Sequence, residues 1–124
     1  MDMTAFYKSV LDQDTDPVVI CDLNHTIIYM NQAAADNYAK DGGWSLMGRS
    51  VLDCHPPQAQ AAVKKVVDWF AQKPENNRIH TFFSRKNCKD IYMVALRDES
   101  GALIGYYEKH ERRTPDSEPY YNFT

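Results

Sequence analysis

The sequence lacks several features that would assign it quickly to a class of protein. It has only three cysteines and no CxxC spacing, which argues against a disulfide framework and a structural zinc site. No apolar run approaches the roughly 20 residues of a membrane-spanning helix, and the opening MDMTAFYKSVLDQD has no signal-peptide pattern. We therefore expect a protein of the reducing cytoplasm that does not associate with a membrane.

Charge and catalytic motifs are equally sparse. The formal net charge is −3 and the pI about 5.7, so no basic field favours nucleic acid as a partner. The sequence has no GxSxG, no HExxH, no phosphate-binding glycine loop, and no histidine paired with a nearby acid on one element. These absences favour a binding or interaction module over an enzyme.

What the sequence does contain is a run of three expected β-strands in its C-terminal half. Isoleucine, valine, phenylalanine and tyrosine are concentrated in Ile79–Ser84, Ile91–Leu96 and Leu103–His110. The connections between them are short and polar, and a parallel crossover needs a dozen or more residues. The three strands are therefore predicted to form an antiparallel meander.

The sequence of the N-terminal half predicts a β-hairpin with helices before and after it. The expected elements are a helix over Thr4–Leu11, strands over Pro17–Leu23 and Thr26–Asn31, a helix over Asn31–Lys40 and a longer helix over Pro57–Gln72. This order predicts an α+β domain with one antiparallel sheet and one helical layer. We expect residues 1–15 to be an N-terminal helical cap, 16–112 the domain, and 113–124 a polar, proline-containing tail.

Three segments in this order resemble the PAS domain family. They are DPVVICDLNHTIIYMNQAAADNY, then MGRSVLDCHPP before the long helix, and RKNCKDIYMVALRDESGALIGYYEKHE. The step Cys54-His55-Pro56-Pro57 is similar to bacterial PAS modules found beside hemerythrin-like domains. The resemblance covers roughly Asp16 to Arg112.

The resemblance implies a five-stranded antiparallel sheet whose inner face and helices enclose a small-molecule cavity. By analogy with flavin-binding relatives, the inner face would carry Cys21, Thr81, Phe83, Ile91, Met93, Ala95, Gly105 and Tyr107. From the long helix, Val63, Val67 and Phe70 would form the opposite wall. The resemblance implies a sensing function, in which a ligand, cofactor, redox or partner signal alters the sheet and is passed to a downstream protein, here unknown.

Two cofactors can be weighed against this resemblance. Val51 stands where the photosensory subgroup has its flavin-reactive cysteine, so flavin is not expected. Val63 stands where the oxygen-sensing subgroup has its haem histidine, so a haem iron or other metal would have to be held by Cys54 or His55. The simpler alternative, which we favour, is that Cys54 fills core volume and His55 packs at the helix start. Of the other histidines, His25 is expected in a turn, with His80 and His110 on the surface.

Two functions therefore stay open. One is a sensor that binds a small, mostly apolar ligand or cofactor, haem included. The other is an interaction module whose core is filled by its own side chains. Strand alternation places apolar residues on the outer sheet face, namely Phe82, Tyr92, Val94, Leu96, Ile104 and Tyr106. Since such a patch indicates an interface, we expect the Thr4–Leu11 helix to cover part of it and a second copy of the chain the rest.

Overall fold

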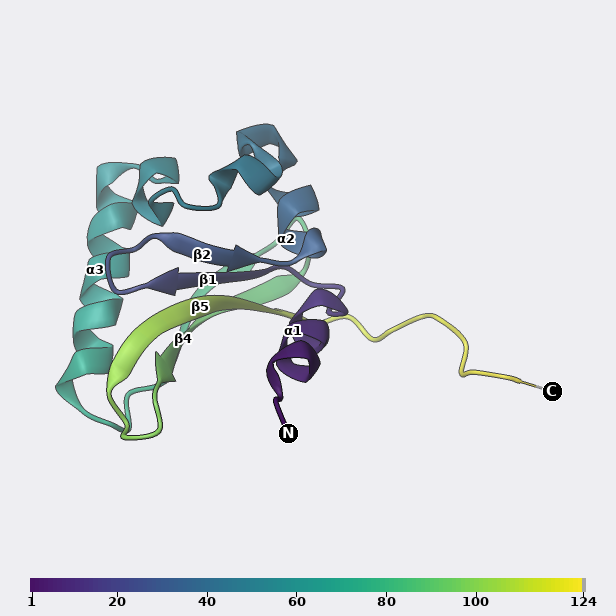
Figure 1. Ribbon diagram of the computed structural model, residues 1–124. Coiled ribbons are helices and arrows are strands. Elements are labelled where there is room, and N and C mark those ends of the chain that lie inside the picture. Colours follow the sequence, from purple (N-terminus) through teal and green to yellow (C-terminus); the bar gives the residue numbers. More distant parts are fainter. Residues whose placement is uncertain (124) are drawn as a thin grey trace.

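Helices cover one face of a single five-stranded antiparallel sheet in the computed structural model, which describes residues 1–123 (Figure 1). The strands are β1 (Val18–Asp22), β2 (Ile27–Met30), β3 (Arg78–Ser84), β4 (Lys89–Arg97) and β5 (Leu103–Arg112). Their order in the sheet is β2-β1-β5-β4-β3, so β5 joins the N-terminal hairpin to the C-terminal meander. The predicted α+β class, the hairpin and the meander are confirmed.

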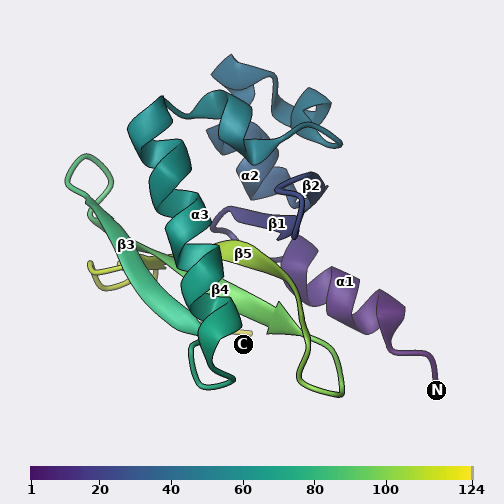
Figure 2. The ribbon, with the colours of Figure 1, turned by 90° about the vertical axis from the view of Figure 1, so that its left-hand side faces the viewer.

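The helical layer is formed by one long helix and several short ones. They are α2 (Gln32–Asn37), the 3₁₀ turns η1 (Ala39–Asp41), η2 (Gly43–Leu46) and η3 (Val51–Cys54), and α3 (Pro57–Gln72). The N-terminal helix α1 (Thr4–Asp12) lies apart from this layer, beside the sheet (Figure 1). Figure 2 shows α3 lying across the sheet, with α2 and the 3₁₀ turns beside its N-terminal end. A proline opens α3, since its missing N–H and fixed φ suit the first helical turn. The fully buried Phe70 confirms the predicted apolar face of this helix.

Asn31 joins the N-terminal elements to one another. Its Oδ1 accepts hydrogen bonds from the backbone N–H of Ala34 (2.9 Å) and of Val18 (3.0 Å), and so caps α2 and fixes the start of β1. Its Nδ2 donates to the carbonyl oxygens of Leu11 and Asp16, both at 3.0 Å. This fully buried amide therefore holds α1, β1 and α2 in one arrangement.

Two β-bulges set which side chains of the meander point inward. In β3 the pairing shifts between His80 and Phe82, so Thr81 is the extra residue opposite β4. In β5 the partners Leu96↔Gly105 and Arg97↔Leu103 leave Ile104 as the extra residue. A Cβ on Gly105 would overlap the carbonyl oxygen of Cys21, so glycine allows β5 to approach β1 closely here.

These bulges make part of the predicted inner face wrong. Phe83 pairs with Asp90 and stacks under the Arg113 guanidinium 3.9 Å away, on the outer face. Tyr107 pairs with Val94 and also faces outward, whereas Tyr106 pairs with Ala95 and faces inward. Tyr106, predicted to face outward, thus faces inward, and Tyr107, predicted to face inward, faces outward.

Four further orientations differ from the prediction for the same reason. Thr81 is exposed in the bulge, and Gly105 belongs to the outer-face register. Phe82 pairs with Ile91 and so leaves the predicted outer patch. His110, expected on the surface, is buried on the inner face of β5.

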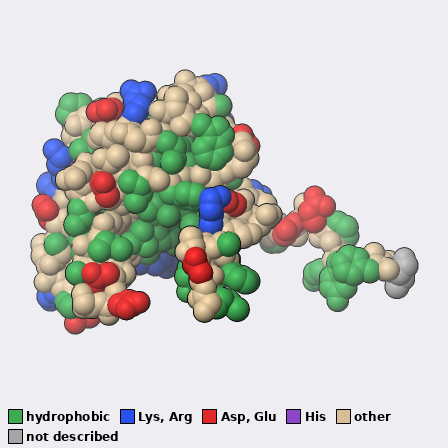
Figure 3. All heavy atoms as spheres, viewed as in Figure 1, with side chains coloured by type: hydrophobic (Ala, Val, Ile, Leu, Met, Phe, Trp, Pro, Cys, Tyr) green, Lys and Arg blue, Asp and Glu red, His purple; other side chains and the backbone are tan. Residues whose placement is uncertain are grey.

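The outer face keeps a smaller apolar patch than predicted. Its members are half-buried residues on the outer face of β1, β4 and β5, namely Ile20, Tyr92, Val94, Leu96 and Tyr107. Figure 3 shows an apolar area on the face of the molecule beside the N-terminal helix. The helix α1 buries none of its own residues, and Phe6, Tyr7 and Val10 are exposed. These three α1 side chains are therefore largely open to solvent, and the expectation that α1 covers part of the patch stays a prediction.

Beyond β5, residues 113–123 contain no helix or strand and extend away from the domain (Figure 1). No helix among residues 1–123 has both the length and the apolar content that crossing a membrane requires.

Candidate functional site: a cavity between the sheet and the helices

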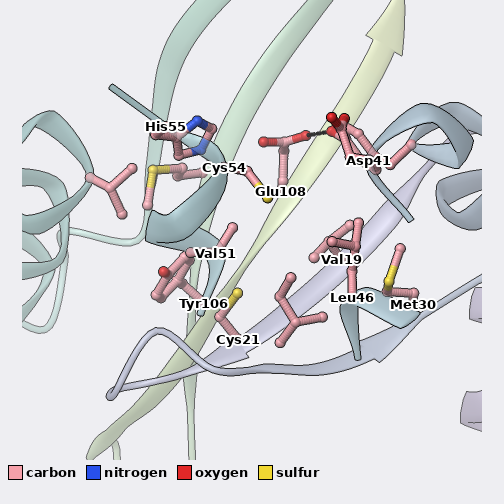
Figure 4. A pocket seen from close by; sticks show the side chains of 14 residues that line it. Val19, Cys21, Met30, Asp41, Leu46, Val51, Cys54, His55, Tyr106 and Glu108 are labelled. Atoms are coloured by element: carbon pink, nitrogen blue, oxygen red, sulfur yellow. Dashed lines mark hydrogen bonds between the residues drawn. The ribbon is translucent and has the colours of Figure 1, made fainter. Parts of the chain in front are cut away.

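A cavity of about 160 Å³ lies between the inner sheet face and the helical layer. Most of its wall is apolar and comes from the two hairpin strands, β4, the 3₁₀ turns and α3: Val19, Cys21, Ile27, Met30, Leu46, Val51, Val63 and Met93. Its polar lining consists of Tyr38, Asp41, Cys54, His55, Tyr106 and Glu108. Figure 4 shows Glu108, Asp41 and His55 toward one end, with Cys21, Leu46 and Met30 toward the other.

The structure brings together five of the nine residues predicted to bind a ligand or cofactor. Cys21, Cys54, His55, Val63 and Met93 line the cavity. Two more, Val67 and Ala95, pack against the core beside it without lining it. The remaining two, Phe83 and Tyr107, lie on the outer face as described above.

Glu108 is the central polar group of the cavity. Its Oε1 accepts hydrogen bonds from the Tyr38 hydroxyl and from His110 Nε2, both at 2.8 Å. Burial opposes ionisation, but these two hydrogen bonds and the nearby imidazoles of His110 and His55 outweigh it, so the pKa of Glu108 lies below its ordinary value. Burial and the Glu108 charge raise the pKa of Tyr38, which keeps that hydroxyl a donor. The cavity therefore contains an ionised carboxylate.

Tyr106 connects the cavity to the β1–β2 turn. Its hydroxyl and His25 Nδ1 are hydrogen-bonded at 2.8 Å, and the two rings pack at a centroid distance of 5.7 Å. Burial raises the pKa of the Cys21 thiol to about 11, although a hydrogen bond with Tyr106 opposes the shift. Cys21 is thus a protonated, unreactive wall residue at neutral pH. His25 does lie in the turn, as predicted, but it also supports a cavity residue.

Cys54 and His55 end η3 at the start of α3. Cys54 is exposed although it borders the cavity, so the prediction that it fills core volume is wrong. Residues 1–123 contain no group of three or more His, Cys, Asp or Glu side chains placed to hold a metal ion. A metal at Cys54 and His55 would therefore have few protein ligands.

Haem does not fit this cavity. An apolar cavity of roughly 150 Å³ accommodates benzene, and the volume here is about 160 Å³. A porphyrin is several times larger. The residues present thus match a one-ring molecule in size, not a macrocycle.

Sequence reasoning missed four polar residues of the site, Tyr38, Asp41, Tyr106 and Glu108. For Glu108 a signal was present: it lies two residues before His110, so the two side chains share one face of the strand. An acid and a histidine that share one face of a strand mark a candidate polar site in the interior. Tyr38 and Asp41 follow α2 in irregular turns, where no periodicity predicts direction.

The fold and cavity together define a small α+β module that can enclose a ligand between a sheet and its helices. The chain belongs to the PAS family, because the sequence model described as PAS fold matches residues 11–114. No curated protein matches the chain.

Solved structures share the fold at low sequence identity. A C-terminal domain from Streptococcus mutans has a TM-score of 0.65 and 23% identity, and the match covers 86% of this chain and 81% of that one. A PAS domain from Colwellia psychrerythraea also reaches 0.65, with 14% identity and coverage of 90% and 97%. The Aer2 receptor from Vibrio cholerae, described as a dual PAS-heme oxygen sensor, has a TM-score of 0.58, 18% identity and coverage of 79% and 94%.

Proposed function

We propose that this PAS domain is a sensor module that binds one small, mostly apolar molecule in its interior cavity and signals through protein contacts. The observation that carries the proposal is the cavity of about 160 Å³ that the chain's own side chains leave unfilled. Protein interiors are otherwise close-packed, and an unfilled volume costs stability. A ligand that fills it recovers those contacts and stabilises the folded state.

A chain of similar fold that is described as VqmA bound to DPO supports ligand binding, with a TM-score of 0.58 and 17% identity over 58% of that chain. In the present chain the apolar wall with a few converging polar groups is the arrangement typical of small-molecule sites. The cavity polar groups, Tyr38, Tyr106 and Glu108, are held by hydrogen bonds before any ligand enters. This preorganisation lowers the entropic cost of binding a ligand.

The alternative is an interaction module that needs no ligand. A variant that fills the cavity distinguishes this alternative from the sensor. Val63→Phe places an aromatic ring on the α3 wall, whereas Ala62→Phe adds the same ring to the exposed side of that helix. The measurement is thermal unfolding of the wild type and both variants with a panel of one-ring compounds, and binding is checked by NMR chemical shifts. We expect at least one compound to raise the Tm of the wild type and of Ala62→Phe but not of Val63→Phe.

The opposite outcome is equally clear. If no compound binds the wild type, and Val63→Phe is more stable with unchanged assembly, the cavity is a packing defect. The chain would then act as an interaction module.

A further inference from the structure

One oxygen of the Glu108 carboxylate accepts hydrogen bonds from the protein, and the other accepts none. Both hydrogen bonds that the carboxylate receives, from Tyr38 and His110, end on Oε1. No group in residues 1–123 donates a hydrogen bond to Oε2. The Glu108 side chain is 35% accessible, and it lines the cavity. The unpaired oxygen is therefore available to a molecule in the cavity.

An ionised carboxylate accepts hydrogen bonds and cannot donate them. A ligand group that meets Oε2 must therefore be a donor, because a second acceptor would leave both groups desolvated and unpaired. The lowered pKa of Glu108 supports this charge state.

The charge at this end of the cavity favours a cation. Asp41 borders the same cavity, and Figure 4 shows it and Glu108 at one end. The imidazole of His55 also lies there, and that of His110 is hydrogen-bonded to Oε1 of Glu108. The cavity lining contains two carboxylates and no lysine or arginine, an arrangement that favours a positively charged ligand over an anion.

We propose that the ligand is a compound of about one apolar ring that carries a protonated nitrogen, which donates to Oε2 of Glu108. This inference rests on the proposed function and specifies its ligand class. The ring lies against the apolar wall formed by Met30, Leu46 and Val51, and the ammonium or amidinium group points toward Glu108 and Asp41. The cavity volume of about 160 Å³ limits the ring portion to one ring.

Three probes of matched size test the ligand class: benzylamine, toluene and benzoate. Each carries one benzene ring, and they differ in having a cationic donor, no polar group and an anionic acceptor. Dissociation constants are measured by NMR titration with the full chain at neutral pH. We expect benzylamine to bind at least about tenfold more tightly than toluene, and benzoate to bind most weakly.

Two variants test whether the cavity carboxylates cause the preference for benzylamine. Glu108→Gln keeps the shape of the side chain and removes its charge, so benzylamine should lose about tenfold in affinity while toluene keeps its own. If Glu108→Gln proves unfolded by circular dichroism, Asp41→Asn serves instead. Asp41 is exposed in a 3₁₀ turn, and the same selective loss is expected there at a smaller size.

The failures of the two proposals are distinguishable. If toluene or benzoate binds as tightly as benzylamine, the cavity is a ligand site and the proposed ligand class is wrong. The class is also wrong if neither variant selectively weakens benzylamine. If none of the three probes binds at millimolar concentration, the proposed ligand class is wrong, and the one-ring panel with Val63→Phe decides separately whether the cavity binds any ligand.

Discussion

Asn31 is the single side chain on which most of the N-terminal architecture depends. Replacement by alanine would leave the buried N–H groups of Val18 and Ala34 and the part-buried carbonyl of Asp16 without their hydrogen-bond partner. The Leu11 carbonyl would lose one of the hydrogen bonds that it accepts. Each unsatisfied group costs about 1–3 kcal/mol. We predict that Asn31→Ala lowers the free energy of unfolding by at least about 3 kcal/mol in urea denaturation.

Asn24 provides the matched control for this prediction, because it lies exposed in the β1–β2 turn. Asn24→Ala should change the free energy of unfolding by less than about 1 kcal/mol. Similar losses for the two alanine variants would show that the Asn31 hydrogen bonds do not stabilise the fold.

The second prediction at the residue scale concerns Glu108 and pH. Its folded-state pKa lies below the ordinary value of 4.5, so the unfolded chain binds the proton more readily. The stability that Glu108 contributes is therefore fully present above about pH 4.5 and is lost as the pH falls through the folded-state pKa. We predict that the difference in unfolding free energy between wild type and Glu108→Gln shrinks steadily below pH 4.5. A difference that stays constant from pH 7 to pH 3 would contradict the charge assignment.

Residue-level prediction from the sequence worked where strands alternate without interruption. Cys21 in β1 and Met93 in β4 line the cavity as predicted, because the extra residues of the neighbouring register shifts lie on the partner strands β2 and β3, so the alternation of β1 and β4 themselves is uninterrupted. Val63 does so because α3 is a regular helix with one apolar face. Glu108 was missed because uninterrupted alternation from Leu103 places it on the outer face, and the Ile104 bulge reverses that. Tyr38 was missed because it follows α2 in an irregular turn, where no periodicity predicts direction.

At the scale of the elements, every expected strand and long helix is present, within a few residues at each end. What the sequence did not reveal is the phase of β3 and β5. A bulge adds one residue to one strand, so every later side chain exchanges faces. The Thr81 and Ile104 bulges depend on pairing with a partner strand, which a single strand's alternation does not encode.

The phase of β5 can be tested with its two adjacent tyrosines. Tyr106 is buried and contacts His25, whereas Tyr107 lies half-buried on the outer face. We predict a loss of about 3–5 kcal/mol for Tyr106→Ala and of about 1 kcal/mol for Tyr107→Ala. Denaturant titration of the two variants in parallel gives the comparison. A larger loss for Tyr107→Ala than for Tyr106→Ala would mean that β5 has no bulge and that Tyr107 is the inward-facing residue.

The helix α3 has a matching test. Phe70 is fully buried, and its carbonyl accepts a hydrogen bond of 2.7 Å from Arg97 of β4, so this end of the helix is fixed on the sheet. Phe70→Ala should cost about 3–5 kcal/mol. Lys64→Ala, on the exposed side of the same helix, should cost a few tenths of a kcal/mol. Equal losses in thermal or urea unfolding would mean that the helix is rotated about its axis.

At the scale of the whole molecule, the outer sheet face divides into a charged part and an apolar part. Charged and aromatic groups interlock around β3 and β4: Asp90 pairs with Arg113 at 2.7 Å and with His80 at 2.8 Å, and Arg78 pairs with Glu111 at 2.9 Å. The apolar part lies over β1, β5 and the adjoining half of β4. A polar border around an apolar centre is the usual composition of a protein interface.

The helix α1 lies beside this apolar part and presents unburied residues of its own, Phe6, Tyr7 and Val10. An amphipathic helix with no buried residue gains little from packing within one chain. A second copy of the chain supplies the missing surface if the two apolar areas meet about a twofold axis. A stable dimer buries roughly 800 Å² on each partner, so α1 and the sheet patch would both have to contribute.

We therefore predict that the wild-type chain is a homodimer at micromolar concentration and that Leu96→Asp makes it monomeric. Leu96 belongs to the outer-face patch, and a carboxylate buried there without a partner opposes association strongly. The matched control is Phe82→Asp, because Phe82 is 60% exposed but the Thr81 bulge turns it out of the patch. Light scattering after size exclusion should give the dimer mass for wild type and Phe82→Asp and the monomer mass for Leu96→Asp. A monomeric wild type at high micromolar concentration would contradict the dimer, and a dimeric Leu96→Asp would place the interface elsewhere on the molecule.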